Sequence, residues 1–140
     1  QLQLKRRDKK KMTTNLEVAK EMYARFGAGD FEGMVALATD DTEWHVCTGA
    51  PYGGQYNGKA QVLTWVGETR QIAFTRFEPT RFFADGDEVV VFVSCEFTVK
   101  ATGKSLATEM VHRMRFVDGK VCYMYEFNSD ARAIAAAFQP

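Results

Sequence analysis

The first part of the chain carries apolar residues at helical spacing, interrupted by one short strand-like stretch. Apolar positions that recur every three or four residues predict amphipathic helices. Thr14 or Asn15 is a suitable N-cap for the first helix and Asp30 for the second, and Asp40-Asp41 predicts a turn. The pattern predicts three helices, one strand and a loop rich in Gly and Tyr: helices 15–27, 31–39 and 59–71, strand 42–47 and loop 48–58.

From Phe74 onward the spacing of apolar residues changes to every second residue, which is the period of a strand. Three turn-forming pairs divide this stretch, Asp85-Gly86, Thr102-Gly103 and Asp118-Gly119. Four strands are therefore predicted, followed by a short helix that begins at Asp130. The strands are 74–84, 87–100, 105–117 and 120–128.

Helices that precede an antiparallel meander predict an α+β fold. Sequential hairpins curl such a sheet, so the three helices are expected on its concave face, with a cone-shaped cavity between the layers. Aromatic residues make up 13% of the 140 residues, which is enough apolar side chain to line that cavity. The length fits one domain, which we expect over residues 12–140.

The formal net charge of zero hides an uneven distribution. Residues 1–11 hold six basic residues and one acidic residue, a net charge of +5. The remaining residues hold 12 basic and 17 acidic residues, a net charge of −5. We interpret residues 1–11 as a basic leader or tail, either idle or a weak anchor for polyanions. The acidic domain gives no reason to expect nucleic acid as a partner.

Nothing in the sequence indicates a membrane span, a secretory signal or a metal site. No apolar run approaches the roughly 18 residues of a spanning helix. Cys47, Cys95 and Cys122 match neither a disulfide framework nor a zinc pattern, and only two histidines are present. We expect buried free thiols, a cytoplasmic location and no cofactor.

Five segments of the chain carry a resemblance to a known family. They are YARFGAGDFEGMV, DDTEWHV, PYGGQYNGKAQV, HRMRFVDGKV and YEFNSDARAIAAAF. Together they resemble the SnoaL-like branch of the nuclear-transport-factor-2-like superfamily over about residues 15–138. This superfamily includes ketosteroid isomerases, polyketide cyclases and limonene epoxide hydrolases. The resemblance implies a cystatin-like cone, with a homodimer packed sheet to sheet.

The resemblance disfavours two of the family's reactions. It places Val46 at the position of the isomerase base, and a valine cannot accept a proton. The isomerase tyrosine falls at Met22, one residue before Tyr23. The epoxide hydrolase triad is missing as well, because its positions hold Val93, Cys95 and Ser129.

A SnoaL-type cyclase remains compatible, because such enzymes shuttle protons with a histidine and an acidic residue. His112 falls at a family site position, and Glu126 or Asp130 could be its partner. Alternation on strand 105–117 puts His112 on the face opposite Arg113 and Arg115, so we expect it to point inward. An inward Glu126 should have a raised pKa. The alternative is a structural histidine bonded to a neighbour.

Other residues are predicted to bind the ligand because of their position. Trp44 and His45 are adjacent on a strand and cannot both face the cavity, so we favour Trp44 but keep His45 as a candidate. Tyr52 and Tyr56 are expected at the cavity mouth. The remaining candidates are expected on the walls: Tyr23, Trp65, Cys95, Phe97, Met110, Met114, Met124 and Asn128.

These observations together predict a protein that binds a small apolar or carbonyl-containing molecule. Its expected reaction, if it is an enzyme, is proton transfer during isomerisation, cyclisation or dehydration, with His112 as acid, base or hydrogen-bond donor. The alternative is a ligand-binding or dimerisation module without a reaction of its own.

Overall fold

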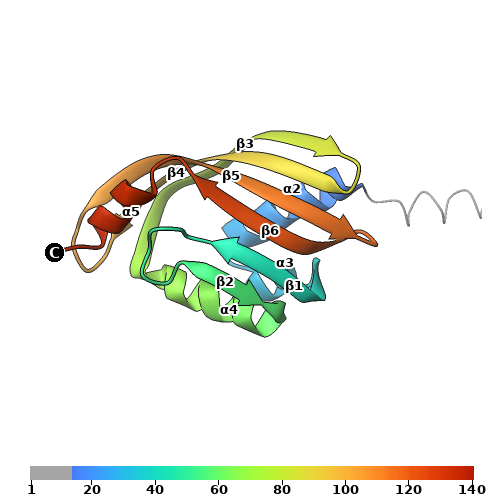
Figure 1. The fold of residues 1–140 in the computed structure, drawn as a ribbon, viewed down its shortest axis with the longest axis horizontal. Helices are drawn as coiled ribbons and strands as arrows, with labels where there is room; N and C mark the ends of the chain where they lie inside the picture. Colours follow the sequence, from blue (N-terminus) through green and yellow to red (C-terminus); the bar gives the residue numbers. More distant parts are fainter. Residues whose placement is uncertain (1–13) are drawn as a thin grey trace, which may run out of the picture.

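Six strands form one curled sheet in the computed structural model, which describes residues 14–140 (Figure 1). The predicted basic leader, residues 1–11, lies outside the described residues. The strand order is β2-β1-β6-β5-β4-β3, in which β1 runs parallel to β6 and the other neighbours are antiparallel. The strands are β1 (Ala38–Val46), β2 (Gly54–Asn57), β3 (Ile72–Asp85), β4 (Glu88–Val99), β5 (Ser105–Val117) and β6 (Lys120–Asn128).

Helices lie inside the curve of the sheet and close one end of it (Figure 1). Thr14 caps the first helix by accepting a hydrogen bond from the Glu17 amide, and Asp30 caps the second in the same way through Gly33. The helices are α2 (Asn15–Gly27), α3 (Phe31–Val35), α4 (Gly58–Glu68), the 3₁₀ turn η1 (Thr69–Gln71) and the closing α5 (Ala131–Ala137). The α+β, cystatin-like architecture predicted from the sequence is confirmed.

The boundary between the second helix and the first strand was predicted wrongly. The helix ends at Val35, and β1 begins at Ala38 and runs through Asp40 and Asp41. The two aspartates are exposed at a register shift in the pairing of β1 with β6, where an extended chain tolerates polar residues. The loop predicted over 48–58 also contains β2, a strand of four residues that pairs with β1.

The inward faces of the long strands form the core. On β4, alternate residues from Val89 to Val99 are buried while their neighbours are partly exposed. Val91, Val93 and Cys95 are 1% exposed or less. Burial of each such side chain stabilises the fold by about 1.5–3 kcal/mol. All three cysteines carry free thiols, but only Cys95 is buried as predicted, whereas Cys47 and Cys122 are partly exposed.

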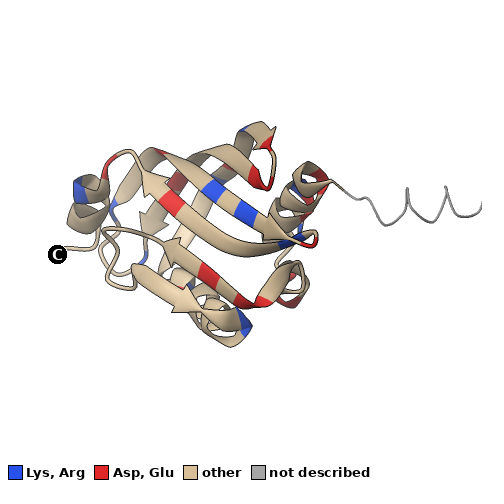
Figure 2. Cartoon of the chain, turned by 45° about the vertical axis from the view of Figure 1, so that its right-hand side comes forward, with Lys and Arg blue, Asp and Glu red and all other residues tan. Residues whose placement is uncertain are grey.

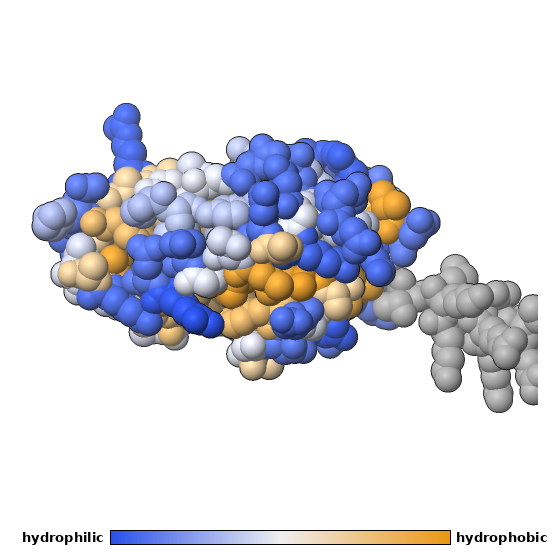
Figure 3. All heavy atoms as spheres, turned by 90° about the horizontal axis from the view of Figure 1, so that it is seen from below, coloured by the Kyte–Doolittle hydropathy of each residue, from blue (hydrophilic) through white to orange (hydrophobic). Residues whose placement is uncertain are grey.

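The surface of the described residues carries both signs of charge and some apolar side chains. Lys and Arg residues are interspersed with Asp and Glu residues in Figure 2. Seen from below, apolar side chains gather in a patch between polar surroundings (Figure 3). Within residues 14–140, no helix combines the length and the apolar content needed to cross a membrane. The exposed large apolar residues are Phe74, Phe83, Val117 and Phe127.

Candidate functional site

A cavity lies between the curled sheet and the helices. It offers about 80 Å³ of free space to the centres of water-sized molecules, which is enough for several waters or a small organic molecule. Its walls are almost entirely apolar, with aromatic side chains from α2, α4 and the strands. The polar exceptions at the wall include Tyr23, His112, Glu126 and Asn128. A site of this kind, apolar with a few convergent polar groups, is typical of small-molecule binding.

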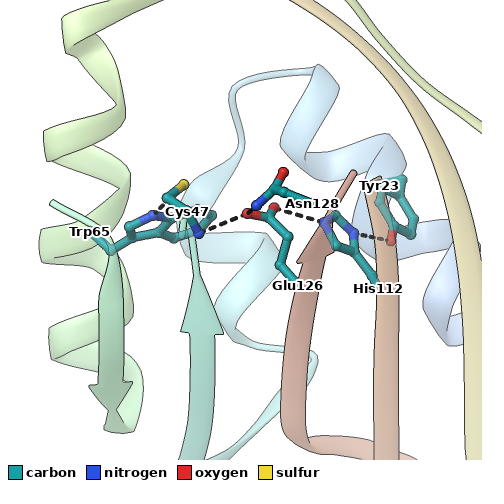
Figure 4. A network of polar contacts seen from close by, with 6 residues as sticks. All are labelled: Tyr23, Cys47, Trp65, His112, Glu126 and Asn128. Carbon is teal, nitrogen blue, oxygen red and sulfur yellow. Dashed lines mark hydrogen bonds and ion pairs between the residues drawn. The ribbon is translucent and has the colours of Figure 1, made fainter. Parts of the chain in front are cut away.

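Three of these polar side chains form a continuous line (Figure 4). The hydroxyl of Tyr23, on α2, lies 2.6 Å from Nδ1 of His112, on β5. Nε2 of His112 lies 2.9 Å from Oε1 of Glu126, on β6. His112 is 4% exposed and Glu126 6% exposed, so the pair is shielded from water. Three separate elements thus bring an acid, an imidazole and a phenol into one hydrogen-bonded series.

The buried carboxylate of Glu126 accepts hydrogen bonds from three donors, of which His112 is the first. The backbone amide of Cys47 donates to Oε2 at 2.7 Å, and Nδ2 of Asn128 donates to the same oxygen at 3.2 Å. Burial on its own raises the pKa of Glu126, but the hydrogen bond and charge of His112 and the other two donors outweigh it. The pKa of Glu126 therefore lies below its ordinary value, and the raised pKa expected from the sequence is wrong.

The ionised carboxylate decides where the protons of His112 and Tyr23 lie. A carboxylate only accepts hydrogen bonds, so Nε2 of His112 carries a proton and donates it to Glu126. When His112 is neutral, Nδ1 has a free lone pair and the hydroxyl of Tyr23 donates to it; when His112 is charged, Nδ1 donates to the Tyr23 oxygen instead. Burial, followed by the charge of Glu126, raises the pKa of Tyr23 well above its ordinary value, so the phenol keeps its proton.

Cys47 anchors the far end of this network. Its backbone has φ = 56°, in the left-handed region that a non-glycine residue seldom adopts, and its amide donates to Glu126. Its Sγ accepts a hydrogen bond of 3.4 Å from Nε1 of Trp65 (Figure 4). Burial, with the nearby charge of Glu126, raises the pKa of this thiol well above its ordinary value. Cys47 is therefore a neutral wall residue and not an activated nucleophile.

Most residues predicted to contact the ligand line the cavity. Those on the helices and on the loop after β1 are Tyr23, Tyr52 and Trp65. Those on the sheet are Trp44, Cys95, Phe97, Met110, Met114, Met124 and Asn128. His112 and Glu126 also line it, so the inward direction expected for both side chains agrees with the structure.

Three predicted residues lie elsewhere. Asp130 caps α5 by accepting a hydrogen bond from the Ala133 amide, so its carboxylate is used structurally. His45 lies on the outer face of the sheet, where it bonds to Glu43 and its ring stacks on that of Tyr125. The Tyr56 hydroxyl donates to the carbonyl of Tyr52 and stays outside the wall.

Several wall residues were not predicted from the sequence. Helical spacing identified Met22 and Phe26 as core positions, but not as part of a cavity. Cys47 was missed because its contact with Glu126 runs through a backbone amide, which leaves no side-chain signal. Phe77 and the closing residues Ile134 and Phe138 also belong to the wall. No group of three or more His, Cys, Asp or Glu residues in the described part of the chain is placed to hold a metal ion.

Comparison with known proteins agrees with this architecture. An NTF2-like protein from Burkholderia thailandensis is 26% identical, with a TM-score of 0.84 over 92% of this chain and 100% of its own. An NTF2-like protein from Burkholderia xenovorans is 26% identical, with a TM-score of 0.81 over 89% and 95%. TerC, co-crystallised with polyporic acid, is 28% identical, with a TM-score of 0.77 over 88% and 96%.

The sequence itself was also compared with curated proteins and with protein families. No curated protein matches it. The SnoaL-like domain matches residues 19–124, which is most of the described chain. The chain therefore belongs to the SnoaL-like domain family.

Proposed function

We propose that this protein binds a small, mostly apolar molecule in the cavity and transfers a proton on it through Tyr23, His112 and Glu126. The observation that carries the proposal is the buried hydrogen-bonded line of these three residues at an otherwise apolar wall. The line has a phenol at the end nearest the helices and an anchored carboxylate at the other end. Its arrangement supports proton uptake better than a purely structural role, which would not need a series of three titratable groups.

When His112 is neutral, the hydrogen-bonded series of Tyr23, His112 and Glu126 acts as a base. A substrate proton passes to the Tyr23 oxygen while the Tyr23 proton passes to Nδ1 of His112. The imidazolium that forms is stabilised by the carboxylate of Glu126, 2.9 Å from Nε2. The same path run backwards returns the proton to another atom of the substrate. A carbonyl compound that forms an enolate is a substrate for this chemistry, in isomerisation, cyclisation or dehydration.

The relatives support the binding part of this proposal. TerC was crystallised with polyporic acid, so a structure 28% identical to this chain holds a small molecule. An apolar cavity excludes water and strengthens the hydrogen bonds along Tyr23, His112 and Glu126.

A direct experiment uses 2-tetralone, a bicyclic ketone with acidic protons beside its carbonyl group. Exchange of these protons in D₂O is followed by NMR with the wild-type protein and with Tyr23→Phe. We expect the wild type to accelerate exchange. The acceleration by Tyr23→Phe should be at least about tenfold smaller, because the phenol relays the proton. Equal acceleration by both proteins would contradict the proposed path.

A second copy of the chain is proposed as the partner, on the outer face of the sheet. Tyr123 and Tyr125 are half-buried there and Phe127 is 51% exposed, which forms an aromatic strip along β6. Arg113 and Arg115 lie beside the strip on β5. Glu43 on β1 supplies the opposite charge. A two-fold interface would place the basic strand of one copy near the acidic residue of the other, around an aromatic centre.

A further inference from the structure

One polar atom at the cavity wall has no hydrogen-bond partner. Among residues 14–140, two buried side-chain atoms lack a partner, Oγ1 of Thr39 and Oδ1 of Asn128. Thr39 does not belong to the cavity wall, whereas Asn128 does. Buried acceptors without a partner are rare in folded proteins, so this amide oxygen calls for a physical explanation.

The free atom of Asn128 must be the oxygen and not the nitrogen. Its Nδ2 donates to Oε2 of Glu126 at 3.2 Å, and an ionised carboxylate cannot pair with an amide oxygen. The same carboxylate oxygen also receives the amide of Cys47, which holds it in place. Figure 4 shows the Asn128 oxygen pointing away from Glu126. The amide is thus fixed with its acceptor turned outward from the network.

The oxygen of Tyr23, on the same wall, is also available as an acceptor. With His112 neutral, the Tyr23 hydroxyl donates a hydrogen bond to Nδ1 of His112, which leaves the lone pairs of its oxygen free. His112 has both ring nitrogens occupied, one by Tyr23 and the other by Glu126. With His112 neutral, Tyr23 and Asn128 therefore offer two hydrogen-bond acceptors, and neither Tyr23 nor His112 has a free donor.

We infer that the ligand carries an O–H or N–H donor, such as an enol, a phenol or another hydroxyl group, and that Asn128 determines this specificity. The inference rests on the proposed function, because it names the ligand class of the same cavity. A donor on the ligand satisfies the Asn128 oxygen, and the acidic proton can also meet the Tyr23 oxygen. A ligand with only a carbonyl acceptor, 2-tetralone included, leaves the Asn128 oxygen without a partner, which lowers its affinity but does not prevent proton exchange at a saturating concentration.

The test uses three probes of nearly equal shape. 2-Naphthol carries a donor, 2-methylnaphthalene carries no polar group and 2-naphthaldehyde carries only an acceptor. Binding of each is measured by calorimetry or by NMR shifts of the cavity methionines. For the wild type we expect 2-naphthol to bind at least tenfold more tightly than either of the other two.

The variant Asn128→Leu keeps the size of the side chain and removes its polar atoms. We expect it to bind 2-methylnaphthalene as the wild type does and to lose the preference for 2-naphthol. Thr39→Val removes the other unpartnered buried oxygen, which lies away from the cavity wall, so it is the matched control and should keep the preference. The wild-type comparison of probes stands by itself if Asn128→Leu does not fold.

Two outcomes would overturn the inference, and they separate it from the proposed function. If the aldehyde or the hydrocarbon binds as tightly as 2-naphthol, or if Asn128→Leu keeps the preference, the donor requirement is wrong while the cavity remains a binding site. If the folded wild type binds none of the three probes, the proposed binding function fails together with the inference.

Discussion

His112 and Glu126 are direct cross-strand partners on β5 and β6, and Nε2 of the histidine lies 2.9 Å from Oε1 of the glutamate. Because directly opposite residues on paired strands share a face, the register alone brings both side chains to the cavity wall. Tyr23 then reaches the free ring nitrogen from α2. A one-residue slip of this pairing would turn one partner to the outer face and break the line.

The first prediction concerns the tautomer of His112. Neutral His112 should carry its proton on Nε2 in the wild type. In Glu126→Gln, the amide oxygen must accept from Cys47 and Asn128, which turns its NH₂ group toward Nε2. His112 should then change to the Nδ1–H tautomer. The ¹⁵N shifts of the imidazole ring measure this, and identical tautomers in both proteins would contradict the network.

Removal of the imidazole should destabilise the fold strongly. His112→Leu leaves the buried carboxylate of Glu126 without its main partner, which costs about 3–5 kcal/mol in the free energy of unfolding. The loss should be smaller at pH 4 than at pH 7, because protonation removes the unpaired charge. Urea unfolding at both pH values measures this, with His45→Leu on the outer face as the control. Equal losses in the two variants would show that burial of the pair is unimportant.

The pH dependence of wild-type stability should carry the signature of Glu126. Its pKa is lowered in the folded protein: burial is the largest single influence and opposes the lowering, but the hydrogen bond and charge of His112 together with the donors Cys47 and Asn128 outweigh it. A lowered folded-state pKa stabilises the fold fully above the unfolded value, near 4.5, and this stability is lost as pH falls through the folded value. The stability difference between wild type and Glu126→Gln should therefore shrink as pH falls from 6 to 3. A difference that stays constant over this range would contradict the assigned pKa direction.

The thiols on the cavity wall should be unreactive. Burial, with a smaller contribution from Glu126, raises the pKa of Cys95 to about 12 and that of Cys47 well above its ordinary value. Alkylation by iodoacetamide at pH 8 should therefore be slow at both residues in the folded protein and fast in urea, as followed by mass spectrometry. Rapid modification of Cys47 in the native state would mean that the wall is open.

The outer face should hold the dimer together. Phe127→Lys places a charge in the aromatic strip of β6 and should shift the protein toward the monomer in sedimentation experiments. Val117→Lys, an equally exposed apolar residue at the end of β5, is the control and should leave the association unchanged. A wild-type protein that sediments as a monomer at all concentrations would overturn the proposed partner.

The sequence predicted the long strands well because two local signals agreed. Alternation with period two and the Asp-Gly and Thr-Gly pairs placed β4, β5 and β6 to within a residue or two. It failed at β1, where Asp40 and Asp41 indicated a turn, and at β2, which lies within the predicted loop. The two aspartates lie between Ala38 and Glu43, which pair with β6 more than seventy residues further along the chain, and no local pattern contains that pairing.

At the site, too, local signals were predictive and contacts between distant parts of the chain were not. The inward direction of His112 followed from the arginines on the opposite face of its strand, a local rule that the structure agrees with. The pKa of Glu126 could not be predicted from burial alone, because its direction depends on donors from His112, Asn128 and a distant backbone amide. Asp130 and His45 were candidates by residue type, and their local bonds to a helix end and to Glu43 remove them from the cavity.

The proton path can be tested most directly with the two histidines of the chain as a matched pair. Exchange of the acidic protons of 2-tetralone is measured for wild type, His112→Gln and His45→Gln, after NMR shifts confirm that each protein binds the ketone. The account predicts that His45→Gln exchanges at the wild-type rate and that His112→Gln loses about 10²-fold or more of the acceleration. Wild-type exchange by a folded, ketone-bound His112→Gln protein would contradict it.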